Sequence, residues 1–187
     1  MVFDNLKAFK LVFWDFDGVL FDSLAIKGRA FADYFSQRDS IIWEKIYGHH
    51  IANGGMPRSE KLPLYSLWSG IERWDDFNAF LFSRLSEEAN FNPEALVAVR
   101  ELHNSRVPQC IVSAALQSEV VALCETACIS YMFDQILGAP AVKTQLIGRM
   151  LTSYRVPHHD AILVGDSNAD HQAANACGIP FLYYKCG

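Results

Sequence analysis

The sequence lacks long apolar runs and lacks any excess of positive charge. Every apolar stretch is shorter than the roughly 18 residues that a membrane-spanning helix needs, so no membrane span is expected. The formal net charge is −5, which disfavours a nucleic-acid partner, because surfaces that bind nucleic acids are rich in Lys and Arg. An anionic ligand would therefore need positive charge concentrated at one place.

Cysteine pairs are also missing. The five cysteines are odd in number, and none forms a C-x-x-C motif. Cys124 and Cys128 are four residues apart, which places them on one face of an expected helix, but buried reduced thiols are favoured over a structural zinc site. Reduced thiols, together with a mixed and polar Met1–Lys10 that does not resemble a signal peptide, predict a cytoplasmic protein.

Residues 24–90 differ in pattern from the rest of the chain. Aromatic-rich helical patterns cover residues 26–37 and 74–89, and a stretch with Gly and Pro at 47–65 is expected to form a loop. No strand is expected in this region. Because the chain has 187 residues, of which 51% are hydrophobic, it suits one core with a modest helical insertion.

Outside the insertion, apolar strand patterns alternate with helical ones. Strands are expected at 11–14, 109–115, 134–138, 161–167 and 180–184. Helices are expected at 92–105, 116–129, 143–154 and 168–178, the first with Asn92 as its N-cap and Pro93 at its first position. This alternation predicts an α/β fold, with a parallel sheet that is covered by helices on both faces. The strand at 180–184 is expected at an edge, where an exposed backbone invites pairing with a second copy.

Polar residues follow the expected core strands. They are Asp15, Asp17, Ser113, Lys143, Asp166 and Asp170. In a parallel sheet, ligands bind beyond the carboxyl ends of the strands, so these side chains are expected to meet at one edge. Clustered carboxylates repel one another and need a cation, and oxygen-only ligands favour Mg²⁺.

The residue types also indicate a chemistry. An aspartate can attack phosphorus to form an aspartyl-phosphate, and Asp17, two residues after Asp15 and on the same face of a strand, could move the proton. A lysine can neutralise both a carboxylate and a phosphate, and a serine hydroxyl can donate a hydrogen bond to phosphate oxygens. Gly18 would let the chain turn sharply behind the two acids.

Four motifs resemble those of the haloacid dehalogenase (HAD) superfamily, and they occur in that family's order. "DFDGVLFDS" (15–23) resembles D-x-D-G-[TV]-L-x-D-S, and "IVSAA" (111–115) resembles an apolar strand that ends in Ser or Thr. "GAPAVK" (138–143) resembles G-x-P-x-x-K, and "VGDSNAD" (164–170) contains G-D-x-x-x-D. One such motif is a weak signal, whereas four in order are a specific one.

The resemblance implies a fold and a division into domains. The fold would be a Rossmann-like parallel sheet of about five strands in the order 3-2-1-4-5, with helices on both faces. The core domain would comprise residues 1–21 and 91–187. Residues 22–90 would form a helical cap domain inserted after the first motif. Lids of this kind exclude water and select the substrate.

The resemblance also implies roles for the acids and the lysine. Asp15 would be the nucleophile and a ligand to Mg²⁺. Asp17 would be the general acid/base, with its backbone carbonyl on Mg²⁺, and Lys143 would bridge Asp15 and the phosphoryl group. Asp166 would be the third protein ligand to Mg²⁺. Asp170 would support the metal, directly or through water and Lys143.

The remaining site residues would bind the substrate. Ser113 would hold phosphoryl oxygens, and Gly18 and Ala114 are assigned to the same phosphate-binding group. Ala114 stands where the family often has a polar residue, so one phosphate contact would be missing or would come from the backbone. In the expected cap, "NGGMPRSEKL" (53–62) resembles a loop of the phosphoglycolate phosphatase and β-phosphoglucomutase-like branch. Arg58 in that loop is the candidate for a bidentate contact with a carboxylate or phosphate.

Taken singly, these residues also have structural explanations. Asp15 and Asp17 are consistent with turn residues, and Ser113 with a hydroxyl at a strand end. Asp170 is consistent with an acid on the side of a helix, and Arg58 fits a surface loop as well as it fits a ligand. The joint occurrence of the four motifs favours the catalytic interpretation.

The sequence therefore predicts a Mg²⁺-dependent phosphatase that acts on a small phosphomonoester through an aspartyl-phosphate on Asp15. Two alternatives remain: a phosphomutase or phosphotransferase with the same chemistry, and a catalytically silent protein that binds a phospho-ligand. Asp17 argues against dehalogenation, because dehalogenases of this superfamily lack that acid. The expected partner is a small phosphorylated metabolite, with neither nucleic acid nor membrane, and the protein is expected to be a monomer or a homodimer. The motifs do not specify the substrate.

Overall fold

The computed structural model describes residues 2–186, and the chain forms two compact units. The core unit combines Met1–Phe21 with Phe91–Gly187, and the helical unit is Asp22–Asn90. The chain passes between them at β2 (Phe21–Asp22) and β3 (Asn90–Phe91), which pair as a two-stranded sheet. The prediction that 24–90 contains no strand is thus wrong at Asn90, because a pair of two-residue strands leaves no periodic pattern in a sequence.

The core unit is built on a five-stranded parallel sheet. Its strands are β1 (Leu11–Trp14), β4 (Gln109–Leu116), β5 (Gln135–Ala139), β6 (Ala161–Gly165) and β7 (Phe181–Tyr183). Their order is β5-β4-β1-β6-β7, and each neighbouring pair is parallel. Counted along the chain as core strands, this order is 3-2-1-4-5, so the predicted α/β fold is confirmed.

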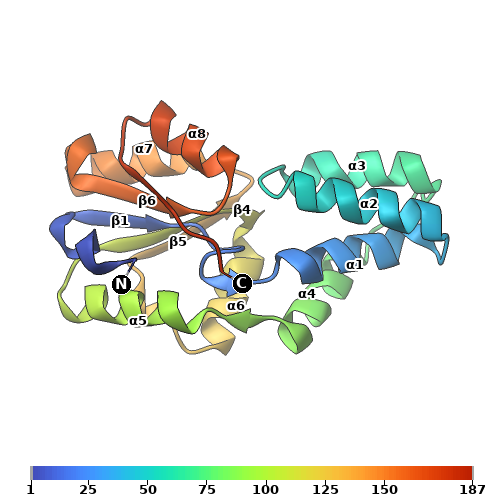
Figure 1. Ribbon diagram of the computed structural model, residues 1–187, viewed down its shortest axis with the longest axis horizontal. Coiled ribbons are helices and arrows are strands. Elements are labelled where there is room, and N and C mark those ends of the chain that lie inside the picture. The colour runs from blue at the N-terminus through green and yellow to red at the C-terminus, as the bar shows by residue number, and fades with distance from the viewer. Residues whose placement is uncertain (1, 187) are drawn as a thin grey trace. The chain divides into compact units, whose positions relative to one another are not determined.

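Helices cover both faces of this sheet (Figure 1). On one face lie α7 (Lys143–Tyr154) and α8 (Asn168–Ala176), and on the other lie α5 (Pro93–Asn104) and α6 (Gln117–Thr126). Short 3₁₀ helices at Asp4–Ala8, Ser130–Met132 and His158–Asp160 complete the unit. As predicted, Asn92 caps α5: its side chain accepts hydrogen bonds from the backbone amides of Glu94 and Ala95.

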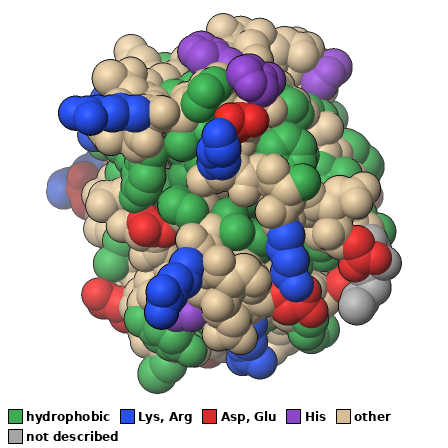
Figure 2. All heavy atoms as spheres, turned by 90° about the vertical axis from the view of Figure 1, so that its left-hand side faces the viewer, with side chains coloured by type: hydrophobic (Ala, Val, Ile, Leu, Met, Phe, Trp, Pro, Cys, Tyr) green, Lys and Arg blue, Asp and Glu red, His purple; other side chains and the backbone are tan. Residues whose placement is uncertain are grey.

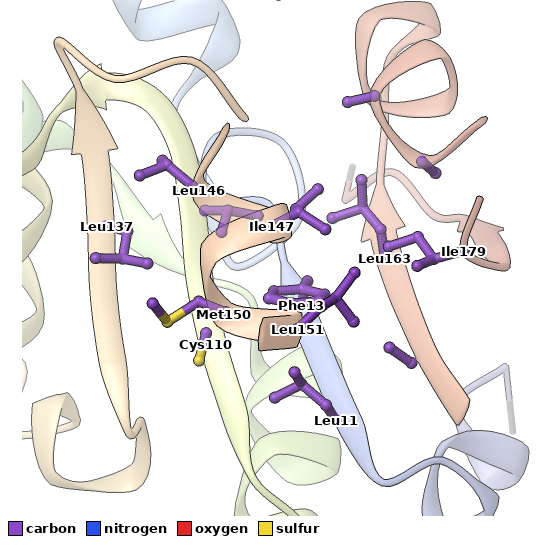
Figure 3. Close-up of a cluster of buried hydrophobic side chains, with 14 residues drawn as sticks. Leu11, Phe13, Cys110, Leu137, Leu146, Ile147, Met150, Leu151, Leu163 and Ile179 are labelled. Atoms are coloured by element: carbon purple, nitrogen blue, oxygen red, sulfur yellow. The ribbon is translucent and has the colours of Figure 1, made fainter. Parts of the chain in front are cut away.

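The apolar stripe of α7 packs against the sheet. Figure 3 shows these helix residues facing side chains from β1, β4, β5 and β6. The labelled residues are Leu146, Ile147, Met150 and Leu151 on α7, Leu11, Phe13, Cys110, Leu137 and Leu163 on the strands, and Ile179 after α8. The helix residues recur at the three-to-four-residue spacing that places side chains on one face of a helix. Burying each Leu or Ile stabilises the fold by roughly 2 kcal/mol. This packing fixes the start of α7, where Lys143 lies, against the sheet.

A hydrogen-bonded pair lies on the other face of the sheet. Trp14 Nε1 donates to Gln109 Oε1 at 3.0 Å, and Gln109 Nε2 donates to the backbone oxygens of Val99 and Met132 at 2.9 and 3.0 Å. Trp14 and Gln109 are both fully buried, so these bonds satisfy polar groups that would otherwise be costly to bury. The pair ties β1 to β4 just before Asp15.

The helical unit contains α1 (Leu24–Ser36), α2 (Ser40–Ala52), α3 (Arg58–Ser69) and α4 (Phe77–Glu88). The loop predicted at 47–65 is therefore wrong, because α2 and α3 cover all of it except 53–57. Ile46, His50 and Tyr65 are buried on these helices. Glycine in this stretch disfavours a helix by roughly 1 kcal/mol, and this is why the sequence predicted a loop. The packing of the buried side chains outweighs that cost.

Aromatic rings form the core of the helical unit. Phe31 lies with its ring centroid 4.6 Å from Phe77 and 5.3 Å from Tyr65, and Phe35 lies 5.7 Å from Phe77. These four side chains are buried, which accounts for the many aromatics in this part of the sequence.

Within residues 2–186, no helix combines the length and the apolar character needed to cross a membrane. On the face drawn in Figure 2, basic and acidic side chains are scattered among apolar ones, with histidines near its upper edge.

Candidate active site

The structure brings four of the predicted residues together at the carboxyl ends of the core strands. Asp15 follows β1, Lys143 begins α7, Asp166 follows β6 and Asp170 lies in the first turn of α8. Carboxylate oxygens of the three acids all lie within 4.8 Å of one another. Three acids and one lysine at this spacing leave an excess of negative charge, so their oxygen donors fit a hard divalent cation.

Lys143 joins two of these acids. Its Nζ lies 2.7 Å from Asp15 Oδ1 and also forms an ion pair with Asp170 Oδ1. Burial opposes the charge of this ammonium, but Asp15 and Asp170 outweigh that effect and hold the pKa of Lys143 above its ordinary value. Lys143 is therefore a fixed positive charge between two carboxylates.

Asp15 is held by the backbone as well as by the lysine. Its amide donates to Val164 O at 2.8 Å, and its Oδ1 accepts from the amide of Phe16 at 2.7 Å. Burial, followed by repulsion from Asp170, raises the pKa of Asp15 well above its usual range, and Lys143 opposes this. Asp15 is buried, and Lys143 and the amide of Phe16 hold its carboxylate in place.

Asp166 is half-buried beside the other acids. Burial, followed by repulsion from Asp170, raises the pKa of Asp166 to about 6. Asp17 adds to this repulsion, whereas Lys143 and Lys185 oppose it, so these three charges lie within electrostatic reach of Asp166. A bound cation would relieve the same repulsion.

Asp170 has partners on both oxygens. Its Oδ1 holds Lys143, and its Oδ2 accepts from the amide and the hydroxyl of Ser167 at 3.1 and 2.6 Å. In return, the Asp170 amide donates to Ser167 Oγ at 3.2 Å, which completes a capping box at the start of α8. Burial opposes ionisation here, but the bonds from Lys143 and Ser167 lower the pKa of Asp170 below its usual value. Asp170 is thus an ionised anchor for Lys143.

Gly165 makes room for this anchor. A Cβ at Gly165 would lie 2.5 Å from Asp170 Cβ and 2.7 Å from Asp170 Cγ, which is closer than real Cβ contacts come. Only glycine lets the end of β6 pass so close to Asp170.

A tight turn carries Asp17 and Gly18. Phe16 O accepts hydrogen bonds from the amides of Leu20 and Phe21 at 3.0 and 2.9 Å, and the Gly18 amide donates to Phe21 O at 2.8 Å. Gly18 has φ +80°, in the left-handed region that favours glycine. The Asp17 side chain is half-buried, and its charge reaches Asp166.

Ser113 and Ala114 lie in an irregular part of β4. The strand predicted at 109–115 extends one residue further, to Leu116. Its register with β5 shifts between Val112 and Leu116, so two residues of β4 are extra in the ladder, as in a bulge. Ser113 is buried, and its Oγ accepts from the Ala115 amide at 3.0 Å, while Ala114 is half-buried. The hydroxyl hydrogen of Ser113 can still be donated to a ligand.

Arg58 belongs to the helical unit. It is the first residue of α3, and its guanidinium donates to Asn78 Oδ1 at 2.7 Å. Its contact with a substrate stays a prediction.

Three residues around the acidic cluster were not predicted from the sequence. Ser167 anchors Asp170, Gly165 makes room for it, and Lys185 contributes a charge near Asp166. "SNAD" has the spacing of a capping box before a helix, so the sequence did carry a signal for Ser167. Lys185 lies beyond the edge strand, where sequence patterns give no information about distant contacts.

Comparison with known proteins identifies relatives of this fold. The sequence profile described as "Haloacid dehalogenase-like hydrolase" matches residues 12–184. Among curated proteins, no sequence matches this chain. One similar solved structure, a haloacid dehalogenase-like family hydrolase from Streptococcus pneumoniae, has 22% identity and a TM-score of 0.66, over 94% of this chain and 84% of that one.

Two further structures carry more specific names. A putative β-phosphoglucomutase from Thermotoga maritima has 20% identity and a TM-score of 0.66, over 91% of this chain and 82% of that one. A putative phosphoglycolate phosphatase from Lactobacillus delbrueckii subsp. bulgaricus has 16% identity and a TM-score of 0.70, over 93% of this chain and 85% of that one. At such low identity, these likenesses show a shared fold.

Proposed function

This chain belongs to the haloacid dehalogenase-like hydrolase family, and on that premise we propose that it is a Mg²⁺-dependent phosphatase that hydrolyses a small phosphomonoester. One observation carries the proposal: Lys143 Nζ lies 2.7 Å from Asp15 Oδ1 and also pairs with Asp170. A buried carboxylate held against a fixed cation suits a nucleophile that must meet a negatively charged phosphoryl group.

In the first step, a carboxylate oxygen of Asp15 attacks phosphorus, and the bond from phosphorus to the substrate oxygen breaks. Asp17, as a carboxylic acid, gives its proton to the leaving oxygen, and the alcohol departs. The product is a phosphoryl group on Asp15. Lys143 neutralises charge that gathers on the phosphoryl oxygens, and Ser113 donates a hydrogen bond to one of them.

In the second step, the carboxylate of Asp17 takes a proton from water. The water oxygen attacks the phosphorus of phospho-Asp15, the bond from phosphorus to Asp15 breaks, and inorganic phosphate is released. Asp17 ends the cycle as an acid and Asp15 as a carboxylate, so protons and bonds balance. Asp170 and Ser167 act through Lys143, because their hydrogen bonds keep its ammonium in line with Asp15.

The oxygen donors of the cluster fit Mg²⁺. Asp15 and Asp166 would hold the ion with their carboxylates, and Asp17 with its backbone carbonyl. When bound, Mg²⁺ would neutralise the clustered acids and polarise phosphoryl oxygens. Asp170 already accepts hydrogen bonds on both oxygens, so we assign it to Lys143 rather than to the ion.

We assign the helical unit, 22–90, to the role of a cap that excludes water and selects the substrate. Arg58 would contact an acidic group of the substrate through its guanidinium. A small phosphorylated metabolite is the proposed partner, and the identity of its carbon skeleton would be set by this unit.

The second candidate function is a phosphomutase or phosphotransferase. It uses the same phospho-Asp15, but a hydroxyl of the substrate replaces water as the acceptor. The names of two structural neighbours, one a putative phosphatase and the other a putative phosphomutase, support carrying both candidates.

The test measures hydrolysis of p-nitrophenyl phosphate and of a panel of phosphorylated metabolites with Mg²⁺. Asp15→Asn is expected to abolish hydrolysis, and EDTA is expected to do so reversibly. Phosphorus NMR then separates release of inorganic phosphate from isomerisation of a sugar phosphate. Hydrolysis that survives both Asp15→Asn and EDTA would refute the mechanism, and the absence of turnover across the panel would favour a silent binding protein.

A further inference from the structure

A short segment after β7 returns to the turn that carries Asp17 and Gly18. The backbone amide of Cys186 donates a hydrogen bond to Gly18 O at 2.8 Å. Cys186 is 7% exposed, so this bond is shielded from competing water. Two parts of the core unit that are far apart in sequence are thereby joined next to the acidic cluster.

Tyr184 anchors the same segment at several points. Its amide donates to Gly165 O at 2.9 Å, and its hydroxyl donates to Glu94 Oε2 at 3.0 Å and accepts from Asn92 Nδ2 at 2.8 Å. Its ring centroid lies 4.6 Å from that of Phe3. These contacts fix where the segment leaves the sheet and therefore where the amide of Cys186 points.

The bond from Cys186 acts on the one residue of the turn that is conformationally free. Glycine adopts positive and negative φ about equally readily, so Gly18 at φ +80° is not held there by its own sterics. Its amide is bonded to Phe21 O within the turn, and its carbonyl is bonded to Cys186. Both peptide groups that flank Gly18 are thus fixed, and Asp17 directly precedes it.

We propose that Tyr184–Cys186 is a positioning segment, which holds the Gly18 carbonyl and thereby sets the direction of Asp17 relative to Asp15. The proposal rests on the proposed function, in which Asp17 moves the proton and Asp15 attacks. A turn free to reorient would misplace the Asp17 carboxyl and backbone carbonyl, and misplacement of a catalytic group by about 1 Å can cost two orders of magnitude in rate. Lys185, in the same segment, adds a positive charge whose field reaches Asp166.

The main test removes a single donor. Cys186→Pro deletes the backbone N–H, and Cys186→Ala is the matched control that keeps the N–H and loses only the thiol. The kinetics are measured at a temperature well below the unfolding midpoint of each variant. For the proline variant we expect kcat for p-nitrophenyl phosphate to fall roughly tenfold or more, with KM changed less than twofold. The alanine variant should keep the parental kcat. A proline variant with parental kcat, or an alanine variant that loses as much, would overturn the proposal.

A second pair covers the case in which the proline variant does not fold. Tyr184→Phe removes the hydroxyl that bonds Asn92 and Glu94, and Tyr183→Phe removes the hydroxyl of the exposed neighbour. We expect Tyr184→Phe to lower kcat with little change in KM and Tyr183→Phe to have no effect. Equal kcat in both variants would count against the segment.

Hydrogen exchange separates this proposal from the proposed function, because it needs no turnover. Mass spectrometry of the peptide that contains residues 15–21 should show faster exchange in Cys186→Pro and in Tyr184→Phe than in their controls. Faster exchange in these variants, together with a parent protein that hydrolyses nothing, would support the segment as a tether while refuting the proposed function. Unchanged exchange and kcat in an active parent would refute the segment and leave the function standing.

Discussion

Lys143 Nζ lies 2.7 Å from Asp15 Oδ1, and the same ammonium is held from the other side by Asp170. The lysine is the first residue of α7, and its charge is maintained by the two acids although it is buried. Because the ammonium offsets the repulsion between two anions, this geometry allows a carboxylate at the end of an apolar strand to approach an anionic phosphoryl group.

Lys143→Gln should lower kcat for p-nitrophenyl phosphate by roughly two to three orders of magnitude, the size of effect typical of a preorganised electrostatic group. The substitution leaves Asp15 and Asp170 facing each other without the intervening charge. Lys10→Gln is a matched control, because Lys10 pairs with Asp160 at 2.9 Å on the exposed surface. Steady-state kinetics decide the matter, and equal kcat values for the two variants would remove Lys143 from the mechanism.

Gly165→Ala should damage the site without replacing a charged residue. The new Cβ would lie 2.5 Å from Asp170 Cβ, so Asp170 or the end of β6 must move, and overpacking of this kind costs about 1–3 kcal/mol. We expect a lower unfolding midpoint and a lower kcat, because Lys143 loses its anchor. Gly148→Ala, in α7, meets no atom within 4 Å and should be neutral or stabilising. A fully active Gly165→Ala would show that the position of Asp170 does not matter for turnover.

Much of this site was predictable from the sequence, and the reason is physical. Strand ends of a parallel sheet meet at one edge, so Asp15, Lys143 and Asp166 could be grouped as soon as the alternating pattern was recognised. Sequence patterns report local periodicity, and they fail where packing between distant segments decides. That is why the helices within 47–65 and the contact of Cys186 with Gly18 were not foreseen.

The hydrogen bonds of Asp170 show a detail of the site that the sequence could not predict. The sequence left open whether this acid supports a metal directly or through Lys143. Which oxygen accepts from which donor depends on distances that no spacing encodes, and in the structure Oδ1 meets Lys143 while Oδ2 meets Ser167.

Ser167→Ala should act on catalysis through this anchor. It removes an N-cap hydroxyl, which costs about 1 kcal/mol of stability, and frees Asp170 Oδ2 from its shortest bond. We expect kcat to fall several-fold while KM changes little, and Ser167→Thr, which keeps the hydroxyl, should restore activity. If Ser167→Ala loses stability but keeps its kcat, Ser167 is a cap and nothing more.

Asp166→Asn should stabilise the metal-free protein above pH 6. Burial and repulsion by Asp170 raise the pKa of Asp166 to about 6 from the ordinary 3.8. Between those values the folded chain binds more protons than the unfolded chain, so the contribution of Asp166 to the free energy of unfolding falls as pH rises through that window. At pH 8 the substitution should therefore gain about 1–2 kcal/mol, after allowance for partial exposure to solvent, and below pH 4 it should gain nothing from this source.

Thermal unfolding in EDTA at pH 4 and pH 8 measures that gain, and Asp160→Asn provides the control of opposite sign. The hydrogen bond from Lys10 lowers the pKa of Asp160, so replacing the Asp160 carboxylate should not stabilise the protein at pH 8. Adding Mg²⁺ should then raise the midpoint of the parent and have much less effect on Asp166→Asn, because a ligand stabilises only the form that binds it. A parent protein whose unfolding midpoint does not change with Mg²⁺ would argue against a metal site at these acids. An Asp166→Asn variant less stable than the parent at pH 8 would show that repulsion among the three acids does not destabilise the fold.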